Sequence, residues 1–269
     1  MHALLNGANI HYVEAGPHSA PPVIFLHGFP FSHAMWHPQI EAVAAAGYRV
    51  VAFDFRGHGN SDVGDGQYTI EGHVDDLFAL LDHLRIPRVV VVGLSMGGYV
   101  ALRALEREQE RFIAAVLCDT RSEADPSEGR IKRAAGMKAV KSTGSAAYAD
   151  DFVKAVFAKE TFAGNPGAVA RIRDIISHTP PLSIAGTLLA LAARTDTTAS
   201  LASIAIPALI LVGEHDVTTP PAASQAMHEK IPTSELHIIP GAAHMSNLEN
   251  PSTFNEKLLT FLQRAAPPR

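Results

Sequence analysis

The residue of this chain best placed to act as a nucleophile is Ser95, at the centre of the sequence GLSMG. Four consecutive valines, residues 89–92, come shortly before it, and an unbroken β-branched run predicts a strand buried on both faces. The sequence ALRAL that follows is typical of a helix. A serine at such an abrupt strand-to-helix turn is held in strained backbone geometry with its hydroxyl above the sheet, and neighbouring glycines leave room for the turn. The pattern therefore predicts a nucleophile elbow rather than a glycine-rich turn with an incidental serine.

A serine hydroxyl is protonated at neutral pH, so Ser95 needs a general base before it can attack a carbonyl group. His244 is our candidate for that base, because it follows a predicted strand on a loop of small residues late in the chain. We assign Asp216 as the carboxylate that orients His244 and stabilises its cationic form. Asp119 also follows a predicted strand and is the alternative for this role. All four residues are expected at the carboxyl ends of strands, the edge at which parallel sheets bind ligands.

Attack on a carbonyl creates an oxyanion, which two backbone N–H groups can stabilise. Met96 begins the predicted helix, so its N–H and the positive end of the helix dipole point the same way. Phe29 is expected to supply the second N–H, because Gly28 permits a close backbone approach and Pro30 has no N–H to donate. We expect His27 to support this loop rather than to contact the substrate.

Alternating strands and helices bring these residues to one edge of a predicted sheet. We expect one or two edge strands within residues 3–15, buried strands at residues 23–26, 89–92, 114–117 and 208–212, and further strands at residues 49–53 and 235–239. Helices are expected at residues 35–46, 68–84, 96–110, 221–230 and 253–264. Because most of these strands are apolar and helices separate them, the expected fold class is α/β, the α/β-hydrolase arrangement of a mostly parallel central sheet flanked by helices.

Residues 122–203 show helical patterns and no strand-like run. Helices are expected at residues 131–140, 146–157, 168–177 and 184–193, with breaks at Gly144 and at residues 165–167 and 180–181. We therefore expect residues 122–203 to form a helical cap subdomain inserted after the sixth strand. Residues 1–121 and 204–269 are expected to form the core domain.

The composition argues against several classes of partner. The 269 residues are 47% hydrophobic and 18% charged, which is enough apolar material for a large core. The net charge of −5 does not favour binding to nucleic acid or to an anionic membrane. Cys118 is the one cysteine, so no intrachain disulfide is possible. Because we find no secretory signal and no apolar run of about 18 residues, we expect a cytoplasmic protein, either a monomer or a small homo-oligomer.

Two other patterns are not expected to hold a cofactor. Residues 54–61, DFRGHGNS, lack the spacing of a phosphate-binding loop, and we expect Arg56 to tie loops together there. No histidine pair has the sequence spacing of metal ligands together with a carboxylate, so we expect no metal site and no cofactor.

Five motifs, in this order, resemble the α/β-hydrolase superfamily over essentially the whole chain. They are HGFP at residues 27–30, DFRGHGNS at 54–61, GLSMGG at 93–98, GEHD at 213–216 and GAAH at 241–244. The order Ser, Asp, His along the chain is also that of the superfamily. Within it, LCDTR at residues 117–121 and the proline-rich cap resemble bacterial carboxylesterases related to 3-oxoadipate enol-lactonases. The elbow serine differs from the aspartate with which the similar haloalkane dehalogenases and epoxide hydrolases attack.

The resemblance implies a carboxylesterase that hydrolyses short- to medium-chain esters, its small-molecule substrates, through an acyl-serine intermediate and without a cofactor. The candidates to line the substrate pocket are Gly28, Phe29, Trp36, Met96 and Phe157. The alternatives are a lactonase of the 3-oxoadipate enol-lactonase type, a carbon–carbon bond hydrolase, a cofactor-free perhydrolase and a ligand-binding protein on the same fold. We find no cluster of basic residues that would bind a dicarboxylate, which argues against a lactonase. Arg121 and Arg133 are the two basic residues that leave the lactonase as an alternative.

Overall fold

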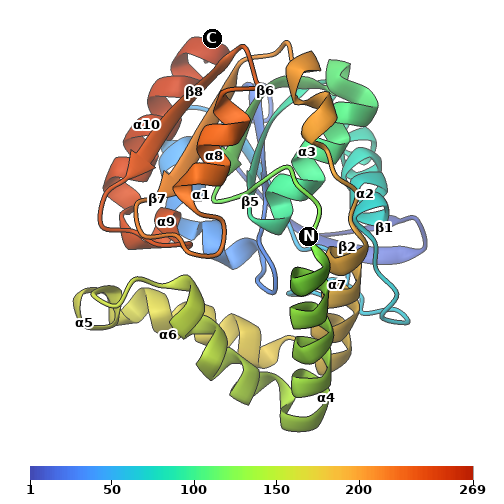
Figure 1. The fold of residues 1–269 in the computed structure, drawn as a ribbon. Helices are drawn as coiled ribbons and strands as arrows, with labels where there is room; N and C mark the ends of the chain where they lie inside the picture. Colours follow the sequence, from blue (N-terminus) through green and yellow to red (C-terminus); the bar gives the residue numbers. More distant parts are fainter. Residues whose placement is uncertain (269) are drawn as a thin grey trace.

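An eight-stranded sheet forms the centre of the fold (Figure 1). The computed structural model describes residues 1–268. Its strands are β1 (His2–Leu5), β2 (Ala8–Ala15), β3 (Pro22–Leu26), β4 (Arg49–Phe53), β5 (Val89–Leu94), β6 (Phe112–Cys118), β7 (Ala208–Gly213) and β8 (Ser234–Ile239), arranged in the order β1-β2-β4-β3-β5-β6-β7-β8. Strands β3 to β8 pair in parallel, whereas β1 with β2 and β2 with β4 are antiparallel. The expected α/β fold with a mostly parallel sheet is therefore confirmed.

Helices cover both faces of this sheet. The helices outside the segment between β6 and β7 are η1 (His33–Trp36), α1 (His37–Ala45), α2 (Ile70–His83), α3 (Met96–Glu108), η2 (Gln109–Arg111), α8 (Pro221–His228), α9 (Ser246–Glu249) and α10 (Pro251–Ala265). Helices α1 and α10 pack against each other on one face, and α2 and α3 pack together on the other (Figure 1). In α2 the buried Val74, Leu77 and Leu81 recur at helical spacing, which is why this segment is a helix with one face in the core. The Thr69 hydroxyl caps it by accepting the Gly72 N–H at 2.9 Å.

Most of the segment between β6 and β7 forms a separate helical layer beside the core, which we call the cap (Figure 1). The cap contains α4 (Ser127–Val156), α5 (Thr161–Gly164), α6 (Pro166–His178) and α7 (Pro181–Ala193). The last helix of the segment, η3 (Thr198–Ser203), lies against the core instead, where Ser203 O accepts a hydrogen bond from the Gln109 side chain at 3.0 Å. The two helices expected at residues 131–140 and 146–157 are the two halves of α4, which is kinked at Gly144 with φ of 80°. Helix α4 begins earlier than expected, because its first turn, SEGR, is polar and gives no apolar periodicity.

The core strands are buried as the valine run predicts. Residues 89–92 are all 0% exposed, and so is Cys118 at the end of β6. Burial, with a smaller contribution from the neighbouring Asp119 carboxylate, raises the pKa of the Cys118 thiol well above its usual range.

Within residues 1–268 no single helix is both long and apolar enough to cross a bilayer. Helices α6 and α7 meet those two criteria only when taken as a pair, and the pair is bent by 98°. The cytoplasmic location stays a prediction.

Candidate active site

Ser95 lies on a sharp turn between β5 and α3. Its backbone has φ of 54° and ψ of −113°, a strained conformation for a residue with a side chain. Two contacts with the end of β6 fix this backbone: the Ser95 N–H donates to Cys118 O at 3.0 Å, and the Thr120 hydroxyl donates to Ser95 O at 2.8 Å. Sequence reasoning missed Thr120, since nothing in the chain itself connects it with the elbow.

The glycines around Ser95 are required by the close approach of backbone segments. A Cβ atom at Gly97 would lie 2.1 Å from the carbonyl oxygen of Leu26 in β3. One at Gly93 would lie 2.3 Å from the carbonyl oxygen of Gly97 itself. Both distances are well below van der Waals contact, so α3 can start this close to the sheet only with glycine at these positions.

His244 and Asp216 form a buried hydrogen-bonded pair at the ends of two adjacent strands. His244 Nδ1 lies 2.8 Å from Asp216 Oδ2, and both side chains are almost completely buried. The same carboxylate accepts the N–H groups of Thr218 and Thr219 at 2.8 and 3.0 Å and the Thr219 hydroxyl at 2.7 Å. A proton on Nδ1 that is donated to Asp216 leaves Nε2 of His244 as the free base.

The surroundings of Asp216 keep its carboxyl group ionised. Burial alone would raise the pKa of Asp216, but the charge and hydrogen bond of His244 and the hydrogen bonds from Thr219 outweigh burial and lower the pKa overall. Thr219 was not identified from the sequence, although a threonine three residues after an aspartate is a common way to satisfy its carboxylate.

Asp119 does not contact the imidazole. It is completely buried, and its carboxyl group accepts the Gly213 N–H at 2.8 Å and the hydroxyl of Ser246. Burial and the nearby Asp216 carboxylate raise the pKa of Asp119 well above its usual range. Asp119 therefore joins the end of β7 to the start of α9, and Asp216 is the carboxylate that is bonded to the His244 ring.

Ser95 and His244 line the same cavity, which has a volume of about 170 Å³. The cavity lies between the sheet and the cap, and its lining residues are Phe29, Ser95, Met96, Tyr99, Arg133, Phe152, Ala155, Val156, Leu191, Thr218 and His244. Most of these side chains are apolar. Phe152 from the cap packs edge-on against Phe29 from the core, with ring centres 5.8 Å apart.

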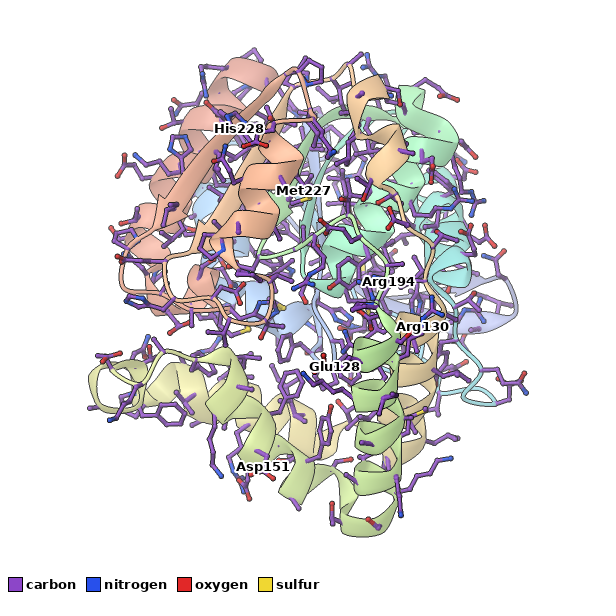
Figure 2. All side chains as sticks on the ribbon, viewed as in Figure 1. Glu128, Arg130, Asp151, Arg194, Met227 and His228 are labelled. Carbon is purple, nitrogen blue, oxygen red and sulfur yellow. The ribbon has the colours of Figure 1, made fainter. Side chains whose placement is uncertain are left out.

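One guanidinium group lies among these apolar residues. Arg133 Nε donates to Asp125 Oδ2 at 3.0 Å, and Arg194 pairs with the other oxygen of Asp125 at 2.6 Å. Arg194 lies where the cap meets the core, with its guanidinium 4.2 Å from the centre of the Tyr99 ring (Figure 2). One carboxylate, Asp125, therefore pairs with both guanidinium groups.

The two expected oxyanion donors belong to residues that line this cavity. Met96 is the first residue of α3, so no carbonyl of its own helix can accept its N–H. Phe29 lies in a loop whose backbone is held by hydrogen bonds to the His27 ring. The His27 ring donates from Nδ1 to Gly28 O at 2.8 Å and accepts the Phe55 N–H at Nε2 at 3.0 Å. Burial lowers the pKa of His27 to about 3, so the ring is neutral.

Three of the expected pocket residues lie elsewhere. Trp36 is 0% exposed and packs in the core, its ring 5.1 Å from that of Phe25 and 6.2 Å from that of Phe254. Phe157 is buried in the hydrophobic cluster at the end of α4 and does not line the cavity. Gly28 lies behind Phe29, where an added Cβ would meet the side chains of Leu94 and Phe31. The prediction that Gly28, Trp36 and Phe157 line the pocket was therefore wrong. The side chains of Trp36 and Phe157 are buried in the hydrophobic core, and Gly28 faces Leu94 and Phe31.

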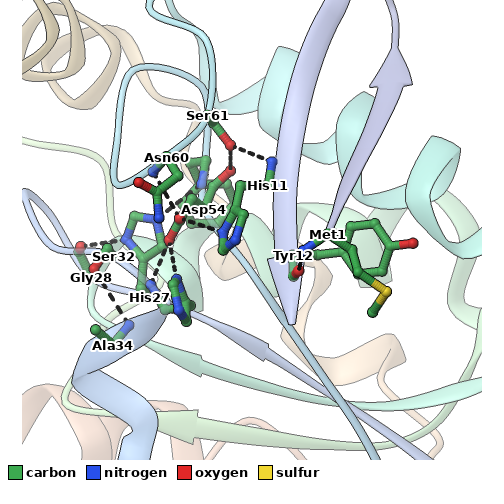
Figure 3. A network of polar contacts seen from close by, with 12 residues as sticks. Met1, His11, Tyr12, His27, Gly28, Ser32, Ala34, Asp54, Asn60 and Ser61 are labelled. Atoms are coloured by element: carbon green, nitrogen blue, oxygen red, sulfur yellow. Dashed lines mark hydrogen bonds and ion pairs between the residues drawn. The ribbon is translucent and has the colours of Figure 1, made fainter. Parts of the chain in front are cut away.

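The motif at residues 54–61 has a structural role. Asp54 is buried, and its carboxylate accepts hydrogen bonds from His11 Nδ1, His33 Nδ1 and the N–H groups of His33 and Asn60 at 2.7 to 3.0 Å (Figure 3). Burial alone would raise the pKa of Asp54, but the hydrogen bonds from the two histidines lower it. As expected, Arg56 ties loops together, since it pairs with Asp76 and donates to the carbonyl oxygens of residues 5 and 6.

His11, His33 and Asp54 are also the kinds of residue that bind metal ions, and their ligand atoms lie within 4.8 Å of one another. Their positions in the chain, more than 20 residues apart, gave no sign of this cluster. In the structure all four acceptor positions of the carboxylate already have donors, so hydrogen bonding alone accounts for the cluster. The absence of a metal site stays a prediction.

Comparison with known proteins identifies the family of the chain. A family model described as "alpha/beta hydrolase fold" matches residues 21–251. The 3-oxoadipate enol-lactonase 1 of Acinetobacter baylyi is 31% identical over 248 residues, which cover 92% of this chain and 91% of that protein. A thermophilic esterase from Thermogutta terrifontis, solved with malate bound, has a TM-score of 0.93 and 31% identity and covers 99% of this chain and 98% of its own. The enol-lactonase from Burkholderia xenovorans LB400 has a TM-score of 0.91 and 30% identity, with 98% and 100% covered. The chain therefore belongs to the family of hydrolases with the alpha/beta hydrolase fold.

Proposed function

We propose that the protein is a carboxylesterase that hydrolyses short- to medium-chain esters through an acyl-serine intermediate. The observation that carries the proposal is the His244–Asp216 pair, 2.8 Å apart, in a cavity that Ser95 also lines. An imidazole held by a carboxylate, in the same cavity as a serine in a strained conformation, is the arrangement that nucleophilic acyl transfer requires.

In the proposed reaction His244 Nε2 takes the proton of the Ser95 hydroxyl as its oxygen attacks the ester carbonyl. The tetrahedral oxyanion is stabilised by the N–H groups of Phe29 and Met96. The C–O bond to the alcohol then breaks, and His244 gives its proton to the departing oxygen. A water molecule, deprotonated by His244, attacks the acyl-serine in the same way, and the carboxylic acid and free Ser95 result. The small, mostly apolar cavity of about 170 Å³ supports short acyl groups as substrates.

Hydrolysis of p-nitrophenyl butyrate by the Ser95→Ala variant tests this proposal. Removing the Ser95 oxygen is expected to abolish turnover, because no other hydroxyl occupies the elbow, and to leave the unfolding transition unchanged. A fluorophosphonate probe should label the wild type at Ser95. Turnover close to wild type in the variant contradicts the proposal, and a wild-type protein that neither turns over nor labels is a ligand-binding protein instead.

A second candidate is an esterase or lactonase for substrates that carry a carboxylate, and Arg133 favours it. This guanidinium lines the cavity that contains Ser95, and it shares its one carboxylate partner, Asp125, with Arg194. The contact with Asp125 uses the Nε–H of Arg133, and the other N–H groups of the guanidinium are of the kind that binds a substrate carboxylate. Among the relatives, two enol-lactonases and the esterase with bound malate are consistent with such substrates.

Paired substrates distinguish the two candidates. Replacement of Arg133 by glutamine should lower kcat/KM for mono-p-nitrophenyl succinate by about 10–100-fold, the usual value of a hydrogen bond to a charged group, and should hardly affect p-nitrophenyl butyrate. Arg130→Gln, an exposed change on the same helix (Figure 2), is the matched control. Equal losses on both esters would argue against recognition of an anion, and a panel of lactones then tests ring opening directly.

A further inference from the structure

Glu249 connects the cap to the loop that carries His244. One of its carboxylate oxygens, Oε1, accepts the N–H of Ala243, the residue directly before His244, at 2.9 Å. The other, Oε2, accepts the N–H of Ala158 at 2.8 Å and the hydroxyl of Thr161 at 2.6 Å. Ala158 and Thr161 lie in the cap, between α4 and the end of α5.

The hydrogen-bond donors to the Glu249 carboxylate are all neutral groups. They are two backbone N–H groups and one hydroxyl, and within residues 1–268 no lysine, arginine or histidine lies within 4.0 Å of this carboxylate. A half-buried carboxylate with three neutral donors and no cation is a hydrogen-bond acceptor that joins two segments, rather than half of an ion pair.

Neighbouring contacts strengthen the same connection. The N–H of Met245, directly after His244, donates to the carbonyl oxygen of Val156 at 3.2 Å. The Asn165 side chain donates to Leu248 O at 3.2 Å. Val156 lines the cavity together with Ser95 and His244. This part of the cap is therefore connected to both chain neighbours of His244, directly from Val156 to Met245 and through Glu249 to Ala243.

We propose that Glu249 is a positioning residue through which the cap holds the catalytic imidazole in register with the bound substrate. The proposal rests on the function proposed above, because it takes His244 as the general base. In this arrangement the cap does more than close the cavity: a shift of residues 155–161 moves Ala243 and Met245, and with them the ring of His244. Misplacement of a reacting group by about 1 Å can cost about 10²-fold in rate, so the link matters for turnover.

Glu249→Gln tests the link with little change in shape. Glutamine has one oxygen for three donors, and its NH₂ group would face an N–H or a hydroxyl, so at least one contact is lost. We expect kcat for p-nitrophenyl butyrate to fall by about 10²-fold with KM close to that of the wild type, because the substrate site stays intact while the base is displaced. Glu160→Gln, an exposed change of the same type next to Thr161, is the control and should leave both constants unchanged.

A double-mutant cycle separates positioning from general destabilisation. Thr161→Val removes one donor and should lower kcat in the wild type, but it should add little in the Glu249→Gln background, because both changes break the same contact. Fully additive losses, an increase in KM with kcat unchanged, or wild-type constants in Glu249→Gln would each overturn the proposal.

Amide hydrogen exchange gives a readout that does not depend on activity. In Glu249→Gln the N–H groups of Ala158 and Ala243 should both exchange faster, one in the cap and one beside His244. If the wild type shows no Ser95-dependent hydrolysis, the proposed function fails, whereas faster exchange at both amides still supports the link. Unchanged exchange at both sites overturns the link itself.

Discussion

Asp216 and Asp119 carry the same functional group, and their surroundings give them different roles. Asp216 is bonded to the His244 ring and accepts three further hydrogen bonds, which together lower the pKa of Asp216 despite burial. Asp119 is bonded to Gly213 and Ser246 instead, and burial beside Asp216 raises its pKa. One carboxyl group can therefore stabilise an imidazolium ion, while the other joins the end of β7 to the start of α9.

Replacement of each aspartate by asparagine should separate these roles. Asp216→Asn should lower kcat by about 10⁴-fold, because an amide can hold the imidazole in the wrong tautomer and does not stabilise its cation. Asp119→Asn should cost far less, since its amide can still accept the Gly213 N–H and bond to Ser246. Kinetics on p-nitrophenyl butyrate, with urea unfolding to check the fold, measure both effects. A larger loss at Asp119 would move the acid role to that residue.

The sequence predicts that both aspartates lie at the same edge of the sheet, but it does not show which of them contacts the His244 ring. Each follows a buried strand of the sheet, so each is delivered to the same edge. What separates them is the turn at residues 216–219, which bends the Thr219 hydroxyl onto Asp216, and α9, whose Ser246 meets Asp119. These contacts depend on loop conformation and on partners up to 127 residues away, which a single sequence does not contain.

At the scale of elements, the junction of β3, β5 and α3 leaves no space for a side chain at Gly97. The carbonyl oxygen of Leu26, which a Cβ at Gly97 would meet at 2.1 Å, belongs to the backbone of a central strand. Because the sheet cannot yield, any larger residue must push the start of α3 away. That displacement would move the Met96 N–H and the backbone of Ser95 together.

Gly97→Ala is therefore expected to damage both stability and activity. Overpacking of this kind costs about 1–3 kcal/mol in the free energy of unfolding, and a displaced elbow should reduce kcat by about 10²-fold. Urea unfolding and ester kinetics measure the two effects. Gly164→Ala, where an added Cβ has nothing within 4 Å, is the matched control. If both variants behave alike, the close approach of α3 to β3 has no role in catalysis.

The helices and strands of this chain differ in how well its sequence predicts them. The valine run predicted β5 because every position is buried, and Gly144 and Pro180 marked real breaks in the cap because glycine and proline act through the backbone. Trp36 was placed wrongly for a different reason. An aromatic residue after a strand-end loop can turn toward the pocket or toward the core, and the answer depends on Phe254, 218 residues later in the chain.

For the molecule as a whole, three buried histidines link stability to pH. Burial lowers the pKa of His27 to about 3 and that of His58 to about 4, and it lowers the pKa of His73 well below the usual range. In the unfolded chain a histidine takes up a proton near pH 6.5. Between about pH 6.5 and 4 the unfolded state therefore binds more protons at these three sites than the folded state, so the free energy of unfolding falls as the pH falls.

His73→Leu isolates one of these contributions. Both ring nitrogens of His73 are buried without a hydrogen-bond partner in the described part of the chain, and the ring packs on Phe55 and Tyr68. Each such histidine lowers the free energy of unfolding by about 2 kcal/mol between pH 7 and pH 5. Over this interval the free energy of unfolding of the variant should therefore fall by about 2 kcal/mol less than that of the wild type. Urea unfolding at pH 7 and pH 5 measures the difference.

Asp119, whose pKa is raised, acts in the opposite sense, but it is the same in variant and wild type and cancels in the comparison. The exposed His37→Gln serves as the control. If the free energy of unfolding falls equally in His73→Leu and in the wild type between pH 7 and pH 5, the folded protein binds a proton at His73 as readily as the unfolded chain does, and the prediction is wrong.

The burial of Cys118 has a practical consequence. The chain has no other sulfhydryl group, and this one is 0% exposed with a raised pKa, so maleimide dyes should not react with the folded protein. Cysteines introduced at exposed sites, such as Leu4 on β1 and Ile131 on α4, could then be labelled selectively without removing the native one. A fluorescent donor and acceptor at those two positions would report, one molecule at a time, whether the cap and the core change their separation while an ester is turned over.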